Sequence, residues 1–146
     1  MDVQHAAVSA DPALNPLGRL RSRTLLLLAA AVIGCAVLFA ATVGHGYLVS
    51  GMLQVPLSEV GSGAHDPKDL PGAMTPTSQV LGWLAIATAP LAGFVGLVVA
   101  GVDLLNSVRE RRTPRQLVPA ATVVVLSAAM LVGCVVLSPL AAWWMD

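Results

Sequence analysis

Charged residues are scarce in this sequence, at 11% of 146 residues, whereas soluble proteins average about a quarter. Apolar residues make up 56% of the chain, and the net charge is zero. A soluble domain is therefore excluded, and so is the basic surface that a nucleic-acid-binding protein needs. The composition indicates a protein whose solvent is the lipid bilayer.

The sequence also lacks the groupings of side chains that carry out chemistry. It has no nucleophile paired with a base, no phosphate-binding glycine loop and no two carboxylates at catalytic spacing. His45 is the only histidine beside an apolar segment, and haem held by two histidines needs a second one at matching depth. His65 and Asp66 are adjacent, but two neighbouring ligands do not make a metal site. We therefore expect no enzyme activity, no cofactor and no metal.

Cysteine is scarce as well: the chain has 2 cysteines, and both lie inside apolar segments. At 1.5 Å per residue, the depths of Cys35 and Cys134 in a membrane differ by roughly 10 Å. A disulfide requires Cα atoms within about 7 Å of each other. We expect both cysteines to be small packing residues.

Long apolar runs are what the sequence has in abundance. Residues 25–44, 80–102 and 117–145 contain no charged side chain, and each run is long enough to cross the ~30 Å hydrocarbon core of a bilayer as a helix. The pattern predicts an all-α integral membrane protein with transmembrane helices over 24–48, 78–106 and 117–145. We expect Trp143 and Trp144 to anchor the end of the last helix among the lipid headgroups.

The segments between these helices differ in composition. Residues 1–23 are rich in alanine and include Pro12 and Pro16, which predicts a flexible cytoplasmic tail. Residues 49–77 are rich in glycine and proline and mildly acidic, which predicts an extracytoplasmic loop. Residues 107–116 form a short basic loop.

Arginine is concentrated beside the first and second predicted helices. The cluster residues are Arg19, Arg21, Arg23, Arg109, Arg111, Arg112 and Arg115. Two crossings separate the clusters, so both lie on one side, which the positive-inside rule assigns to the cytoplasm. The N-terminus is then cytoplasmic and the C-terminus extracytoplasmic. The bias toward Ala, Val, Leu, Gly and Arg is typical of a GC-rich bacterial genome and indicates a bacterial inner membrane.

The central helix carries a stripe of small residues at alternating steps of three and four, which places them on one face. They are Gly82, Ala85, Ala89, Ala92 and Gly96, and the same spacing continues through Val99, Asp103 and Asn106. Small side chains let helix backbones approach closely in a membrane. The stripe therefore predicts a seam that contacts a partner membrane protein, a second copy of the chain, or the chain's own first and third helices.

Two polar residues lie beside the predicted spans, Asp103 near the cytoplasmic end and His45 at the opposite end. We expect Asp103 to reach water or to pair with Arg109 or Arg112, because a charge near the interface costs less than one at mid-bilayer. The alternative is a proton or cation site, or a link to a partner's arginine. His45 is expected to bond to backbone or water.

Pro90 lies inside the central helix and frees the carbonyl of Ile86, which predicts a bend. In a bilayer that carbonyl needs another donor, and we expect Thr88 or a neighbouring helix to supply it.

These observations leave three hypotheses for function. The first is a non-catalytic accessory or assembly subunit of a larger membrane complex, because the small-residue seam suits helix docking. The second is an oligomeric channel, transport or holin-like membrane-permeabilising protein, although the spans lack the polar stripe of a wet pore. The third is an electron-transfer anchor that uses His45 and Tyr47, with the remaining ligands supplied by a partner.

Overall fold

The structure is a computed structural model that describes residues 16–60, 62, 66, 69 and 74–145. These residues form helices joined by turns, and no strand occurs among them. Three helical segments are long and apolar enough to cross a membrane: Arg21–Val49, Pro76–Arg109 and Pro114–Val136. The prediction of an all-helical chain with three helices of membrane-spanning length is confirmed.

The first helical segment begins earlier than predicted. It consists of α1 (Pro16–Phe39), the π-helix η2 (Ala40–Gly44) and α2 (His45–Val49), which continue one another. Proline is favoured at the first position of a helix because its fixed φ suits that position. Part of the predicted 1–23 tail is therefore helical, whereas residues 1–15, including His5, lie outside the described residues.

Two local features mark the far end of this segment. Residues 40–44 have the wider π hydrogen-bond pattern, and the hydroxyl of the buried Thr42 there donates to the carbonyl of Leu38 at 2.7 Å. Gly51 then adopts a left-handed conformation, with φ at 75°. Glycine tolerates this conformation, which is a common way to terminate a helix.

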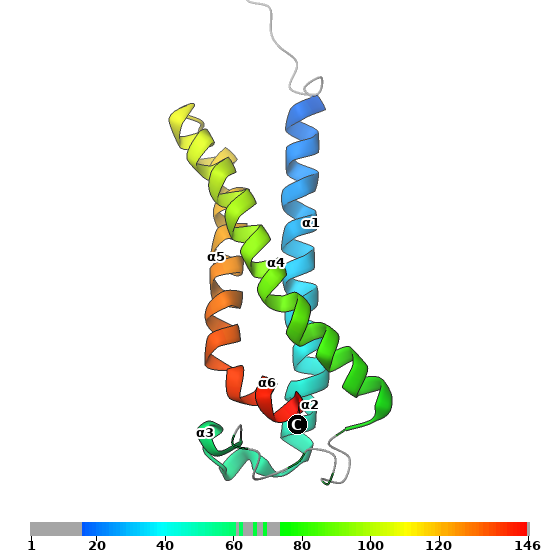
Figure 1. Ribbon diagram of the computed structural model, residues 1–146. Coiled ribbons are helices and arrows are strands. Elements are labelled where there is room, and N and C mark those ends of the chain that lie inside the picture. The colour runs from blue at the N-terminus through cyan, green and yellow to red at the C-terminus, as the bar shows by residue number, and fades with distance from the viewer. Residues whose placement is uncertain (1–15, 61, 63–65, 67–68, 70–73, 146) are drawn as a thin grey trace, which may run out of the picture.

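The central helix, α4 (Pro76–Arg109), begins two residues before the predicted start at residue 78, and a capping box precedes it. Thr75 is the N-cap, and its hydroxyl accepts from the Ser78 amide at 3.1 Å. The Ser78 hydroxyl accepts in return from the Thr75 amide at 2.8 Å. At 34 residues the helix is about 51 Å long. It runs obliquely across α1 and contacts both α1 and α5 (Figure 1).

The predicted single helix over 117–145 is wrong, because the chain forms two helices there. They are α5 (Pro114–Val136) and α6 (Ser138–Met145). Pro139 has no amide hydrogen, so it leaves the carbonyl of Val135 without its helical donor. Instead, the hydroxyl of Ser138 donates a hydrogen bond to the Val135 carbonyl at 2.8 Å. The chain then turns, and α6 lies across the end of the bundle (Figure 1).

The two C-terminal tryptophans are core residues rather than lipid-facing anchors. Trp143 and Trp144 are both 0% exposed. They pack with Val43, Met52 and Val60, which bring together η2, η3 (Met52–Gln54) and α3 (Leu57–Val60). We call η3, α3 and α6 the terminal lobe. The described part of the predicted 49–77 loop thus folds back under the bundle to cover the tryptophans.

Aromatic geometry holds the terminal lobe onto the first helical segment. The ring of Tyr47 meets that of Trp143 edge to face, with centroids 6.1 Å apart, an arrangement that adds to the benefit of burial. The Tyr47 hydroxyl donates to the carbonyl of Met52 at 3.1 Å. This end of the bundle is therefore closed by side chains of α2, η3 and α6.

Candidate functional site

The small-residue face of α4 is covered by other helices of the same chain. A Cβ atom at Gly82 would overlap the Trp144 indole, and one at Gly96 would overlap the Ser127 hydroxyl of α5. At Gly93 it would lie 3.1 Å from Cγ of Leu131. A side chain at Gly82 or Gly96 would therefore force Trp144 or Ser127 to shift, and one at Gly93 would press on Leu131, so the small residues allow the neighbouring helices to lie close.

The buried line on α4 departs from the predicted stripe by one residue along its second half. Ala92 is only half-buried, and Val99 and Asn106 are exposed. An α-helix has 3.6 residues per turn, so it drifts by about 20° per heptad from a strict 3.5-residue spacing. The buried positions follow the true helical period: Gly82, Ala85, Ala89, Gly93, Gly96, Ala100 and Ser107.

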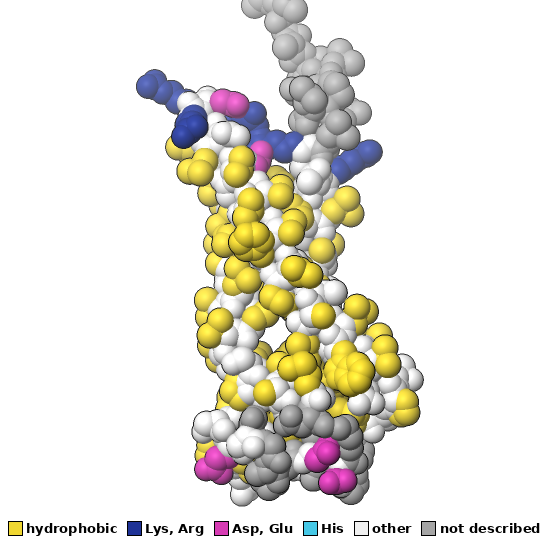
Figure 2. Space-filling model, viewed as in Figure 1, with side chains coloured by type: hydrophobic (Ala, Val, Ile, Leu, Met, Phe, Trp, Pro, Cys, Tyr) yellow, Lys and Arg dark blue, Asp and Glu magenta, His cyan; other side chains and the backbone are white. Residues whose placement is uncertain are grey.

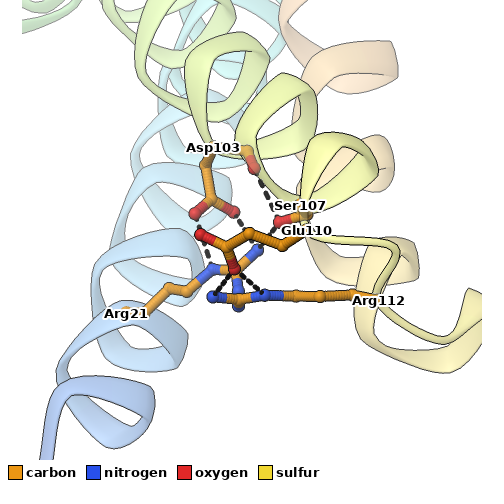
Figure 3. Close-up of polar contacts among 5 residues, drawn as sticks. All are labelled: Arg21, Asp103, Ser107, Glu110 and Arg112. Carbon is orange, nitrogen blue, oxygen red and sulfur yellow. Dashed lines mark hydrogen bonds and ion pairs between the residues drawn. The ribbon is translucent and has the colours of Figure 1, made fainter.

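An ion pair joins two helices at the arginine-rich end (Figure 3). Arg21 of α1 reaches Asp103 of α4, with Nε 2.6 Å from Oδ1. Its Nη2 donates to Oδ2, also at 2.6 Å. The Nη2 contact is a charge-assisted hydrogen bond, whereas Nε lies within ion-pair distance of Oδ1 without forming a hydrogen bond. The partner of Asp103 is therefore Arg21, and the expected pairing with Arg109 or Arg112 is wrong.

Ser107 completes this site from the next turn of α4. Its side chain is on the same helix face as Asp103 because the two residues are four apart, and Ser107 is 1% exposed. The Ser107 hydroxyl accepts from Nη2 of Arg21 and donates to the carbonyl of Asp103 at 2.7 Å. The sequence stripe missed Ser107 because the 3.5-residue spacing pointed to Asn106 instead.

The same serine joins the ion pair to the turn that ends α4. The Arg112 amide donates to the carbonyl of Ser107 at 3.1 Å, and the Arg111 amide to that of Val108 at 3.0 Å. Arg111 has φ at 52°, which places an arginine where a helix of this ending usually has glycine. Glu110 pairs with Arg112 across the turn at 2.6 Å. The turn returns the chain into α5.

Burial distinguishes these two ion pairs energetically. The side chains of Arg21 and Asp103 are 20% and 23% exposed, whereas those of Arg112 and Glu110 are 35% and 56% exposed. An exposed pair contributes about 0.2 to 1 kcal/mol, because water screens it. Removing one member of a partly buried pair costs more, because the remaining charge has lost its partner. The Arg21–Asp103 pair is thus a clamp between α1 and α4.

The described arginine side chains lie at one end of the bundle, where Figure 2 shows the dark blue atoms. They come from the first half of α1, the end of α4, the turn after α4 and the start of α5. Arg19 lies within α1, but its side chain is not described. Lys68 and His65 are outside the described residues. Glu59 in α3 is at the opposite end, in the terminal lobe.

Asp103 and His45 are not brought together. Asp103 lies in the clamp, whereas His45 is exposed at the start of α2, at the other end of the bundle (Figure 1). Within the described residues, no group of three histidine, cysteine or acidic side chains is placed to hold a metal ion.

The two cysteines and Pro90 lie within the three long helices, away from their ends. Cys35 and Cys134 are free thiols, and Cys35 Sγ lies 3.6 Å from Oγ1 of Thr88. The Thr88 hydroxyl donates to the carbonyl of Leu84 at 2.7 Å, so it is not the donor expected for Ile86. Pro90 and Cys134 both line a cavity between α1, α4 and α5.

Comparisons with protein-family models, with curated proteins and with solved structures found no match to this chain.

A double-mutant cycle tests the clamp. Replacing Arg21 with Gln or Asp103 with Asn should each lower the free energy of unfolding by about 1 to 3 kcal/mol, because each leaves a partly buried charge without its partner. The double variant should lose less than the sum of the two. The measurement is denaturant unfolding in detergent micelles followed by circular dichroism.

The exposed pair supplies the matched control for this cycle. Replacing Arg112 with Gln and Glu110 with Gln, singly and together, should show a coupling energy of about 0.2 to 1 kcal/mol. Additive losses at Arg21 and Asp103, or a coupling no larger than that of the control, would contradict the clamp.

Proposed function

We propose that this chain is an integral protein of a bacterial cytoplasmic membrane, with its arginine-rich end and N-terminus in the cytoplasm and its C-terminus outside. The long helices expose bulky apolar side chains that water would solvate poorly, such as Leu26 at 71% and Val135 at 75%. The gathering of described arginines at one end supports the orientation, because positive residues are retained on the cytoplasmic side. The bacterial assignment rests on composition.

Within that membrane we propose a non-catalytic role, as an accessory or assembly subunit of a larger complex. This proposal is carried by one observation at the clamp. There the polar side chains of Arg21, Asp103 and Ser107 bond to one another. They hold α1 and α4 together, and the exposed surface of the helices between the two ends of the bundle is largely apolar. Such a subunit would act by packing against other proteins of the complex rather than by catalysing a reaction.

The contact surface differs from the one that the small-residue stripe suggested. Because α1, α5 and α6 cover that stripe, a partner would meet the opposite side of α4. Bulky exposed residues recur there at steps of three and four: Leu91, Phe94, Val98, Val102 and Leu105. We call these five residues the outer stripe.

The channel or holin-like alternative receives less support from the same geometry. A conducting path needs polar or charged groups that face water, and Asp103 is engaged by Arg21. The electron-transfer alternative depends on His45, which is exposed and distant from the clamp.

Reporter fusions test the orientation. A periplasmic phosphatase fused after Asp146 should be active, and a fluorescent protein that folds only in the cytoplasm should be dark there. Fusions within 107–116 should show the reverse pattern. A fluorescent C-terminal fusion without phosphatase activity would overturn the orientation.

Co-purification in mild detergent tests the accessory role. The tagged chain should retain a membrane protein in a fixed ratio, and replacing Val98 with Trp in the outer stripe should release it, because an oversized side chain disrupts a packed helix contact. The matched control is the same substitution at Val125, which is 65% exposed on α5. A partner-free wild-type chain, or equal release by both variants, would contradict the proposal.

A further inference from the structure

The middle of the bundle contains an apolar cavity of about 530 Å³ between α1, α4 and α5. Figure 2 shows the molecule hollowed between α5 and the crossing of α1 and α4. The lining comes from all three helices and includes Ile33, Ala36, Pro90, Ala129, Gly133 and Cys134. The two ends of the bundle are closed, by the clamp and by the terminal lobe, but the helices separate between them.

Glycine contacts show where this separation begins. At Gly93 and Gly96 of α4 an added Cβ atom would run into α5. At Gly133, two residues beyond Leu131 on α5, an added Cβ atom would meet nothing within 4 Å. The face of α5 that carries Gly133 is therefore open toward the cavity that this residue lines.

Water is a poor occupant of this space. A buried water needs two to four polar partners, and the lining is alanine, valine, leucine and similar side chains apart from Cys134 and Ser138. The Ser138 hydroxyl already donates to the carbonyl of Val135 at 2.8 Å. An empty space is also unfavourable, because its lining forfeits dispersion contacts. The cavity is more than three times the volume of an engineered apolar cavity of about 150 Å³ that binds benzene.

The size and the opening of the cavity indicate its occupant. An apolar space of about 530 Å³ is larger than one small apolar molecule needs, and the long apolar molecules that surround an opening on a membrane-spanning helix are lipid acyl chains. Ile33 lines the cavity and is 49% exposed, so the space continues into the outer surface of the helices.

We propose that this cavity is a binding site for one acyl chain of a bilayer phospholipid, which enters between α1 and α5 while its headgroup stays outside. The uncharged lining recognises the hydrocarbon and not the headgroup. The inference rests on the membrane insertion proposed above and is independent of the accessory role. Alkaline extraction of the wild-type membrane fraction checks insertion separately.

Native mass spectrometry tests the site. The protein is reconstituted in dioleoyl phosphatidylcholine, transferred to a mild detergent and measured for retained lipid. The wild type should carry one phospholipid. Gly133→Leu should lower the lipid-bound fraction about tenfold or more, because the new side chain takes the room of several methylene groups.

The chain offers a matched control at Gly101, where an added Cβ atom also meets nothing within 4 Å but which does not line the cavity. Gly101→Leu should retain lipid as the wild type does. Ala36→Leu fills the cavity from α1 and serves as a second test if Gly133→Leu fails to fold by circular dichroism.

Three results would overturn the proposal. The first is a wild-type protein without lipid, and the second is equal retention by the wild type and both cavity-filling variants. The third is retention of phosphatidylglycerol but not phosphatidylcholine, unchanged by the variants, which would assign the lipid to headgroup binding at the arginines. Equal retention of both lipids, lost in the cavity-filling variants, supports acyl-chain recognition.

Discussion

Close approach of helix backbones along the small-residue face of α4 is the constraint on which the rest of this structure depends. Lipid tails are as apolar as leucine side chains, so three apolar helices gain nothing in a bilayer merely by hiding from lipid. Their association must come from dispersion contacts and polar pairs. Gly82, Gly93 and Gly96 allow those contacts because neighbouring side chains occupy the space that a Cβ atom would need.

The two ends of the bundle are held by different chemistry, and the difference shapes the middle. The arginine-rich end is fixed by the Arg21–Asp103 clamp, and the other end by Trp143 and Trp144 packed under the terminal lobe. Pro90 and Gly133 lie between the two ends of the bundle and line the cavity, and their side chains are too small to fill it. The cavity is therefore a consequence of closing both ends around a helix that crosses obliquely.

The sequence was sufficient for the features set by composition and length, and insufficient for those set by tertiary contacts. Long charge-free runs predict the three long helices because helix length is fixed by bilayer thickness. The break at Leu137 was missed because the charge-free run continues to residue 145, and Pro139, which signals a helix break, was included in the predicted helix. The Arg21–Asp103 pair was missed because its members are far apart in sequence, and Ser107 because a 3.5-residue spacing loses phase over a long helix.

The central claim is that the small-residue face of α4 packs against α5 of the same chain, and a disulfide measures that contact directly. A Cβ atom at Gly96 would lie 3.5 Å from Cβ of Ser127, which is within the range of about 3.5 to 4.5 Å for disulfides. With Cys35 and Cys134 replaced by Ser, Gly96→Cys with Ser127→Cys should oxidise in membranes to a cross-linked monomer. Disulfide-linked dimers or adducts with another protein, without the cross-linked monomer, would contradict the account.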